Sequence, residues 1–276
     1  SDVCSSDLVR ALRTIPMFVE IAEAIRDYAP KAWVINYTNP MSLCVKTLYH
    51  VFPEIKAFGC CHEVFGTQKL LAQIAERELG LTNIAREDIV VNVLGLNHFT
   101  WFDRASYKGI DLFPVYRHFI ETHFEEGFEE KDNNWMNSTF ACAHRVKFDL
   151  FQKYGWIAAA GDRHLAEFMP PIYLKDPQTV ASWKFGLTTV TWRKEDLKKR
   201  LEKSKRLVSG EEQVELNPSG EEGILLIKAL CGLTRVISNV NIPNTAGQIP
   251  NLPKSAVVET NAVFSRDSIA PVYAGN

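Results

Sequence analysis

Three segments of the chain run from an apolar, strand-like stretch directly into polar side chains that could take part in chemistry. They are residues 33–40, 55–62 and 89–98, which end in Asn-Pro, Cys-His and Asn-His. In open α/β sheets, ligands bind at the carboxyl ends of parallel strands. If these three strands are neighbours, two amides, a thiol and two imidazoles meet in one cleft. The sequence therefore predicts a combined metal and substrate site.

Helices and strands alternate through the first hundred residues. Apolar residues at helical spacing precede Pro30, and Asn39 before Pro40 is typical of a helix N-cap followed by proline at the first helical position. Gly80 is typical of a helix end. This alternation predicts an α/β fold with a partial Rossmann-like parallel sheet. The expected elements are helices ending at Pro30, at about Val51 and at Leu79, strands over 33–36, 55–61 and 89–95, and a turn at 108–109.

The pattern changes beyond about residue 110, where aromatic-rich helical segments replace the regular alternation. A polar stretch at 209–223 indicates a loop, and the last 40 residues indicate strands and loops. We expect residues 1–100 to form the C-terminal part of a Rossmann-like domain and residues 101–276 a larger α+β domain for substrate binding and oligomerisation. The helical segments expected there cover 113–130, 142–154, 162–169 and a basic, solvent-facing helix near 193–207.

Composition limits the possible functions. The chain has 276 residues, 46% of them hydrophobic, which is enough to bury a sizeable core. The net charge of −2 argues against a nucleic-acid partner, and no apolar run approaches the roughly 20 residues needed to cross a bilayer. The six cysteines are scattered, and no secretory signal precedes them. We therefore expect a cytoplasmic protein with free thiols and no membrane partner.

A glycine-rich phosphate-binding turn is missing from the sequence. A dinucleotide-binding half opens with a strand and such a turn, whereas this chain has no GxGxxG and begins with polar residues 1–8. Two interpretations are open: a fold that never had the turn, or a fragment that joins the domain late. In the second case the chain should bind NAD poorly.

Four ordered blocks resemble the NAD- and manganese-dependent glycoside hydrolases of family 4, especially their α-galacturonidase branch. The blocks are Asn-Tyr-Thr-Asn-Pro at 36–40, Gly-Cys-Cys-His at 59–62, Gly-Leu-Asn-His-Phe-Thr-Trp at 95–101 and Gly-Asp-Arg-His-Leu-Ala-Glu-Phe at 161–168. The resemblance implies a homo-oligomeric enzyme with NAD and Mn²⁺ that acts on a sugar substrate. Three alternatives remain: an α-galactosidase, a dehydrogenase of the lactate/malate type, and an inactive fragment.

The resemblance also implies a metal site and a proton donor. Cys61 and His98 match the family's two metal ligands, and a thiolate with an imidazole suits a borderline divalent ion. Cys60 should point to the other face of the sheet and belong to the core. His62 is the candidate acid or hydrogen-bond donor to the substrate, or alternatively a helix-capping histidine.

The remaining candidate residues concern the base, the cofactor and the sugar. Asp162 matches the family's base, or else caps the helix that follows it, with His164 next in line as the base. The family's route oxidises the sugar at C3 with NAD and removes the C2 proton before elimination and water addition. Asn36 is expected near the nicotinamide, and Asn39 and Asn97 at the sugar. A cationic group could bind a uronate carboxylate or form surface salt bridges; it comprises Arg163, His164, His144 and Arg145.

Overall fold

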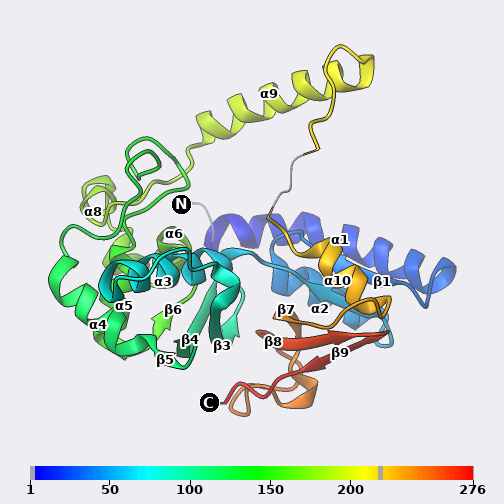
Figure 1. Cartoon of the computed structure of the whole chain (residues 1–276). Helices are drawn as coiled ribbons and strands as arrows, with labels where there is room; N and C mark the ends of the chain where they lie inside the picture. The colour runs from blue at the N-terminus through cyan, green and yellow to red at the C-terminus, as the bar shows by residue number, and fades with distance from the viewer. Residues whose placement is uncertain (1–3, 217–219, 276) are drawn as a thin grey trace.

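The first of two sheets joins strands from the beginning and the end of the chain. The computed structural model describes residues 4–216 and 220–275 (Figure 1). Strands β1 (Trp33–Asn36) and β2 (Lys56–Gly59) are parallel, and α2 (Met41–Val51) connects them as a crossover helix. Strand β7 (Val236–Pro243) then pairs antiparallel with β2, followed by β8 (Val257–Ser265) and β9 (Ser268–Pro271). The fold is therefore α/β with a parallel strand pair, as predicted, and the sheet continues with antiparallel strands.

The prediction that the strand near 89–95 is a third parallel neighbour is wrong. β3 (Ile89–Leu96) pairs antiparallel with β4 (Phe99–Tyr107) in a second sheet, which β5 (Ile110–Asp111) and β6 (Ile157–Ala158) complete. Only Asn97 and His98 separate β3 from β4, and His98 has a left-handed φ of 63°. Such a short reversal can only join antiparallel strands, because a parallel connection needs a crossover of a dozen or more residues.

The two sheets nevertheless lie against each other. The Asn261 side chain on β8 donates to the Val91 carbonyl on β3 over 2.7 Å. At the other end of β3, Asn97 Nδ2 donates to Glu259 Oε2 on β8 over 3.2 Å, and His98 lines one cavity with Cys61, which follows β2. The expected convergence of polar residues is thus reached by a different topology.

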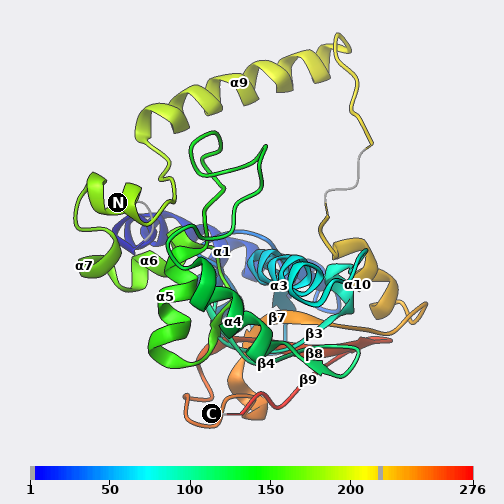
Figure 2. The ribbon, with the colours of Figure 1, turned by 60° about the vertical axis from the view of Figure 1, so that its left-hand side comes forward.

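Helix α3 (Glu63–Leu79) has the predicted bounds and ends at Gly80, which adopts φ 64°. It covers the second sheet together with α4 (Leu112–His123) and α5 (Arg145–Tyr154), and the largest apolar core lies between them (Figure 2). The predicted N-cap of α2 is shifted by one residue. Pro40 holds the N-cap position without a side-chain cap bond, and Met41 is the first helical residue.

The other helices surround these layers. α1 (Cys4–Tyr28) packs beside α2, and α6 (Asp162–Phe168) follows β6. The basic helix α9 (Val190–Ser209) projects from the rest of the protein in both views and has no buried residue, as its charged sequence predicts (Figures 1 and 2). Within the described residues, no helix combines the length and the apolar character needed to cross a membrane. The short helices are α7 (Pro170–Tyr173), α8 (Pro177–Ser182), the unpredicted α10 (Gly223–Leu230), and 3-10 turns at Arg86–Asp88 and Asn244–Ala246.

Candidate active site

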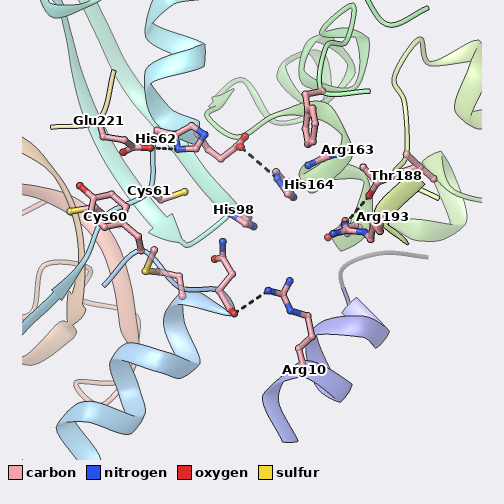
Figure 3. Close-up of a pocket in the computed structure, with 17 residues that line it drawn as sticks. Arg10, Cys60, Cys61, His62, His98, Arg163, His164, Thr188, Arg193 and Glu221 are labelled. Carbon is pink, nitrogen blue, oxygen red and sulfur yellow. Dashed lines mark hydrogen bonds and ion pairs between the residues drawn. The ribbon is translucent and has the colours of Figure 1, made fainter. Parts of the chain in front are cut away.

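A cavity of about 430 Å³ lies where β2, the β3–β4 turn and α6 come together (Figure 3). The N-terminal ends of α3 and α9 and one side of α1 complete its wall. Six residues proposed from the sequence contribute to its lining: Asn39, Cys61, His62, His98, Arg163 and His164.

Cys61 and His98 supply the soft and borderline donors of this cavity. Burial, with the nearby Glu259 carboxyl, raises the pKa of the Cys61 thiol, whose sulfur also accepts from the Glu63 backbone N–H. Burial, with the charge of His164, lowers the pKa of His98 to about 4. The imidazole is therefore neutral at neutral pH, as metal ligation requires. This donor pair is suited to a divalent transition metal.

His164 is stacked on His98 and is held by Glu63. The ring centroids are 4.0 Å apart with an interplanar angle of 22°. His164 Nε2 lies 3.5 Å from Glu63 Oε1, while Glu63 Oε2 accepts from the Gly161 backbone N–H over 2.9 Å. Burial opposes ionisation of Glu63, but these bonds and the charges of both histidines hold its pKa well below the usual range. Sequence reasoning missed Glu63, although it follows the Cys-His pair directly.

Three guanidinium groups line the same cavity. The Arg163 guanidinium lies 4.7 Å from the Phe140 ring centroid, and Arg193 Nη2 donates to Thr188 Oγ1 over 2.8 Å. Arg10 was not among the candidates, and neither was Arg193 from the otherwise solvent-facing α9. Two arginines far apart in the sequence carry no local signal that they share a cavity with a third.

The other two members of the predicted cationic group are not part of this cavity. Arg145 donates to the Phe124 carbonyl over 3.0 Å and to Glu125 over 2.5 Å, so it stabilises the segment before α5. His144 lies outside the cavity lining as well. Arg145 therefore forms a salt bridge, which is the alternative that its sequence position left open.

Some buried polar atoms of the lining have no hydrogen-bond partner among the described residues, and two of them belong to residues proposed from the sequence. They are Asn39 Oδ1 and His164 Nδ1. Buried polar groups are nearly always bonded in folded proteins, so such atoms in a cavity indicate a place for ligand or water. The exposed His62 instead pairs its Nδ1 with Glu221 Oε1 at 2.9 Å. It does not cap α3 with its side chain, although it occupies the N-cap position.

Asn36 and Asn97 are bonded within the protein. The Asn36 amide accepts from the Thr38 N–H over 3.0 Å and donates to the Thr38 carbonyl over 3.0 Å. Asn97 Nδ2 donates to Glu259 Oε2 over 3.2 Å. Neither residue lines the cavity, so each supports the strand ends from behind.

Asp162 is buried and caps a helix, but not the helix that it begins. Its carboxylate accepts from the backbone N–H groups of Val146 at 3.1 Å and Lys147 at 3.2 Å, both in the first turn of α5. Burial raises the pKa of Asp162 to about 6. The residue lies outside the 430 Å³ cavity, on the wall of a neighbouring one of about 250 Å³.

Glu259 on β8 is the second acidic residue that sequence reasoning missed. It is buried behind Cys61, where Asn239 Nδ2 donates both to Glu259 Oε1 over 2.7 Å and to the Cys61 carbonyl over 3.0 Å. Burial raises the pKa of Glu259 to about 7. Cys60 packs in a buried cluster with Phe58 and Val240, as predicted, but it also contributes to the lining of the 430 Å³ cavity, which was not predicted.

Comparison with known proteins identifies the family. The chain is 76% identical to an alpha-galacturonidase of Lachnoclostridium phytofermentans over 97% of its length and 58% of that protein, and 27% identical to an alpha-galactosidase of Bacillus subtilis over 97% and 57%. It superposes on the crystal structure of Bacillus subtilis lplD with a TM-score of 0.91 at 54% identity, over 97% of this chain and 61% of that one. The fold is shared with a 6-phospho-alpha-glucosidase from gut microorganisms solved with NAD and Mn²⁺, at a TM-score of 0.68, 20% identity and 96% and 58% coverage.

The chain thus spans about three fifths of the length of these relatives. Residues 2–77 match the family model for family 4 glycosyl hydrolase, and residues 93–276 match the model for the family 4 glycosyl hydrolase C-terminal domain. The protein belongs to glycosyl hydrolase family 4.

Proposed function

We propose that this protein hydrolyses α-galacturonides. The observation that carries the proposal is a cavity in which Arg163 and Arg193 accompany the Cys61–His98 donor pair. Arginine binds carboxylates bidentately, so the cavity suits a sugar with a carboxylate better than one with a hydroxymethyl group. The 76% identity to an alpha-galacturonidase agrees with this substrate class.

We propose Cys61 and His98 as ligands of Mn²⁺. The two side chains line one cavity, and the neutral state of His98 favours ligation. A divalent ion held there would supply Lewis acidity to substrate oxygens. Asn39 Oδ1, buried without a partner among the described residues, is suited to accept a hydrogen bond from a sugar hydroxyl.

NAD dependence is proposed from family membership alone, because the described residues do not fit this cofactor well. The turns after β1 and β2 consist of Tyr-Thr-Asn-Pro and Cys-Cys-His, which cannot form a glycine-rich cradle for a pyrophosphate. Asn36, proposed beside the nicotinamide, already uses its amide on Thr38. Residues 1–100 would belong to the NAD-binding part and residues 101–276 to the catalytic part, whose β7–β9 extend the same sheet.

For proton transfer, His164 is a better base than Asp162. Its Nε2 faces Glu63, which leaves Nδ1 in the cavity lining to accept a proton from the sugar. Asp162 has both carboxylate oxygens engaged by backbone N–H groups of α5. His62, exposed and paired with Glu221, is proposed to donate a proton to the leaving oxygen.

The test compares two sugars that differ in one carboxylate. Galacturonate and galactose are titrated calorimetrically into the chain with Mn²⁺ and reductant, and paired chromogenic α-galacturonide and α-galactoside are assayed with NAD added. Galacturonate should bind more tightly, and Arg163→Ala should reduce its affinity by about tenfold or more, since hydrogen bonds to charged groups contribute about 1.5–3 kcal/mol. Galactose binding should hardly change. Equal affinity for both sugars in the unmodified protein contradicts the proposal.

A further inference from the structure

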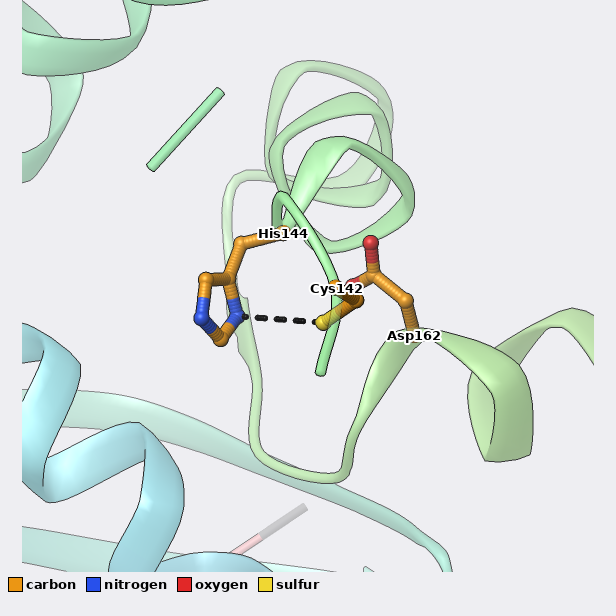
Figure 4. Close-up of side chains that lie close together, drawn as sticks. All are labelled: Cys142, His144 and Asp162. Atoms are coloured by element: carbon orange, nitrogen blue, oxygen red, sulfur yellow. Dashed lines mark hydrogen bonds between the residues drawn. The ribbon is translucent and has the colours of Figure 1, made fainter. Parts of the chain in front are cut away.

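A second group of metal-ligating side chains lies outside the cavity that contains Cys61 and His98. The ligand atoms of Cys142, His144 and Asp162 are all within 4.8 Å of one another, and Cys142 Sγ is 3.7 Å from His144 Nδ1. Figure 4 shows the His144 ring and the Asp162 carboxylate on either side of the Cys142 sulfur. We propose that these three residues form a binding site for a zinc-like divalent cation.

The donor types match such an ion, and so does the spacing between sulfur and nitrogen. Zinc is bound by thiolate sulfur at about 2.3 Å, imidazole nitrogen at about 2.0–2.1 Å and carboxylate oxygen at about 2.0–2.2 Å, in tetrahedral geometry. At those lengths a sulfur and a nitrogen on one ion are roughly 3.5 Å apart. The observed 3.7 Å between Cys142 Sγ and His144 Nδ1 is close to this value. The hard cations Mg²⁺ and Ca²⁺ prefer all-oxygen sites, so this donor set disfavours them.

The backbone holds the Cys-Ala-His segment in position from both sides. Ala143 N–H donates to the Lys184 carbonyl over 2.9 Å, and the Ala143 carbonyl accepts from the Phe128 N–H over 2.8 Å. His144 has a left-handed φ of 60°, uncommon for a residue with a side chain, and this conformation turns the chain so that the His144 ring reaches the thiol two residues earlier. Burial raises the pKa of the free Cys142 thiol to about 12, although the sulfur accepts from the backbone N–H groups of Asp162 and His144, which favour ionisation. A bound divalent ion would supply the charge that holds the sulfur as a thiolate.

Asp162 reaches the cluster from a different element and can still ligate an ion. Each of its oxygens accepts one backbone N–H from α5, and an ionised carboxylate offers about four lone-pair sites. The two N–H bonds fix the carboxylate in the way that bonds to metal ligands commonly do. With three protein donors, a fourth position is left on the side of the 250 Å³ cavity, whose wall includes Cys142 and Asp162.

The buried Lys147 ammonium is the feature that opposes a cation. Its positive charge favours the ionised forms of both Asp162 and Cys142. Its Nζ donates to Thr67 Oγ1 over 2.8 Å. A dication bound by one thiolate and one carboxylate gives a cluster with no net charge, so binding does not place excess positive charge beside Lys147. The ion would tie the segment before α5 to the start of α6, behind the wall formed by Glu63 and His164. This role is independent of the proposed hydrolase activity.

The test uses the 276-residue chain with Cys61→Ser, which removes the thiolate of the proposed manganese site. Co²⁺ is titrated into the metal-free protein, and the sulfur-to-cobalt charge-transfer absorption is recorded. The absorption should appear with one Co²⁺ per chain and disappear in the double variant Cys61→Ser/Cys142→Ser. Replacing the exposed Cys231 by Ser in the same background is the matched control and should leave the absorption unchanged.

A second variant covers the case in which Cys142→Ser does not fold. His144→Asn removes the imidazole but keeps a residue that tolerates the left-handed backbone. It should weaken Co²⁺ and Zn²⁺ binding by about tenfold or more. Absence of the thiolate–cobalt absorption in Cys61→Ser, its survival in the double variant, or unchanged affinity in His144→Asn would overturn the proposal. These measurements report only on metal binding at Cys142, His144 and Asp162, so their outcome does not depend on the galacturonate test.

Discussion

Replacing Glu259 by Gln should abolish much of the loss of stability that the unmodified protein shows between pH 5 and pH 8. Burial raises the pKa of this carboxyl from 4.5 to about 7, although hydrogen bonds from Asn97 and Asn239 favour ionisation. The folded protein therefore binds a proton more tightly than the unfolded chain does. The resulting stabilisation is complete below about pH 4.5 and is lost as the pH rises through about 7.

The expected magnitude follows from these two pKa values. Between pH 5 and pH 8 the linkage relation gives a loss of about 2.5 kcal/mol for a single group shifted in this way. A glutamine resembles the protonated carboxyl and does not titrate, so the variant should keep its stability over the same range. Asp162, whose pKa is raised to about 6, adds a loss of the same sign to both proteins. The difference between the two pH curves, rather than either curve, therefore reports on Glu259.

Urea unfolding at pH 5, 6.5 and 8, followed by circular dichroism, measures this difference. A chelator is present at every pH so that no metal binding contributes. Glu20→Gln on the exposed side of α1 serves as the control and should follow the unmodified protein. If the curve of Glu259→Gln runs parallel to that of the unmodified protein, the burial argument for Glu259 is refuted.

Two further perturbations test the site and its support. Cys61→Ser should weaken Mn²⁺ binding by about tenfold or more in calorimetry, because a hydroxyl is a poor substitute for a thiolate. Cys60→Ser is the neighbouring control: Cys60 also lines the cavity but is not proposed as a ligand, so this change should leave the affinity unaltered. Equal affinities in Cys61→Ser and the unmodified protein would count against the ligand assignment. Thr67→Val should lower the free energy of unfolding by about 1–3 kcal/mol. The reason is that the Thr67 hydroxyl accepts a hydrogen bond from the buried Lys147 ammonium and donates one to the Ala159 carbonyl over 2.7 Å. An unchanged urea midpoint would mean that another group forms the hydrogen bond with Lys147.

The sequence predicts local structure well where neighbouring residues determine it. Helix α3 has its predicted bounds because an apolar stripe and the terminal Gly80 both lie within the segment. The turn at Lys108 and Gly109 has positive φ at both residues, as a tight hairpin turn requires. Strand β1 is also found where the sequence places it. These features need no information about distant parts of the chain.

Strand partners could not be predicted in the same way. The short apolar run of β3, rich in valine, indicates a strand, but a strand pattern does not identify its neighbour. The insertion of β7 beside β2 joins residues about 180 positions apart, as the pair Gly59 and Asn241 shows. No local signal encodes that choice, and the same is true of Arg193, which reaches the cavity from α9.

Asp162 shows why residue type is insufficient to infer a role. Its position in a family block fits a base, and its position before a helix fits a cap. The structure shows it as a cap, but of α5 rather than α6, because the loop before α5 folds back onto the start of α6. The sequence could not distinguish these cases, since both depend on which helix end lies nearest in space.

The C-terminal strands β7 and β8 link the two proposed metal ligands more directly than the N-terminal strands β1 and β2 do. Glu259 on β8 bonds Asn97, the residue before His98, and also Asn239 on β7, which donates to the Cys61 carbonyl. One buried carboxyl therefore connects the β3–β4 turn to the end of β2. Because the metal ligands come from residues 61 and 98, whereas this link comes from β7 and β8, the site requires both ends of the chain to fold together.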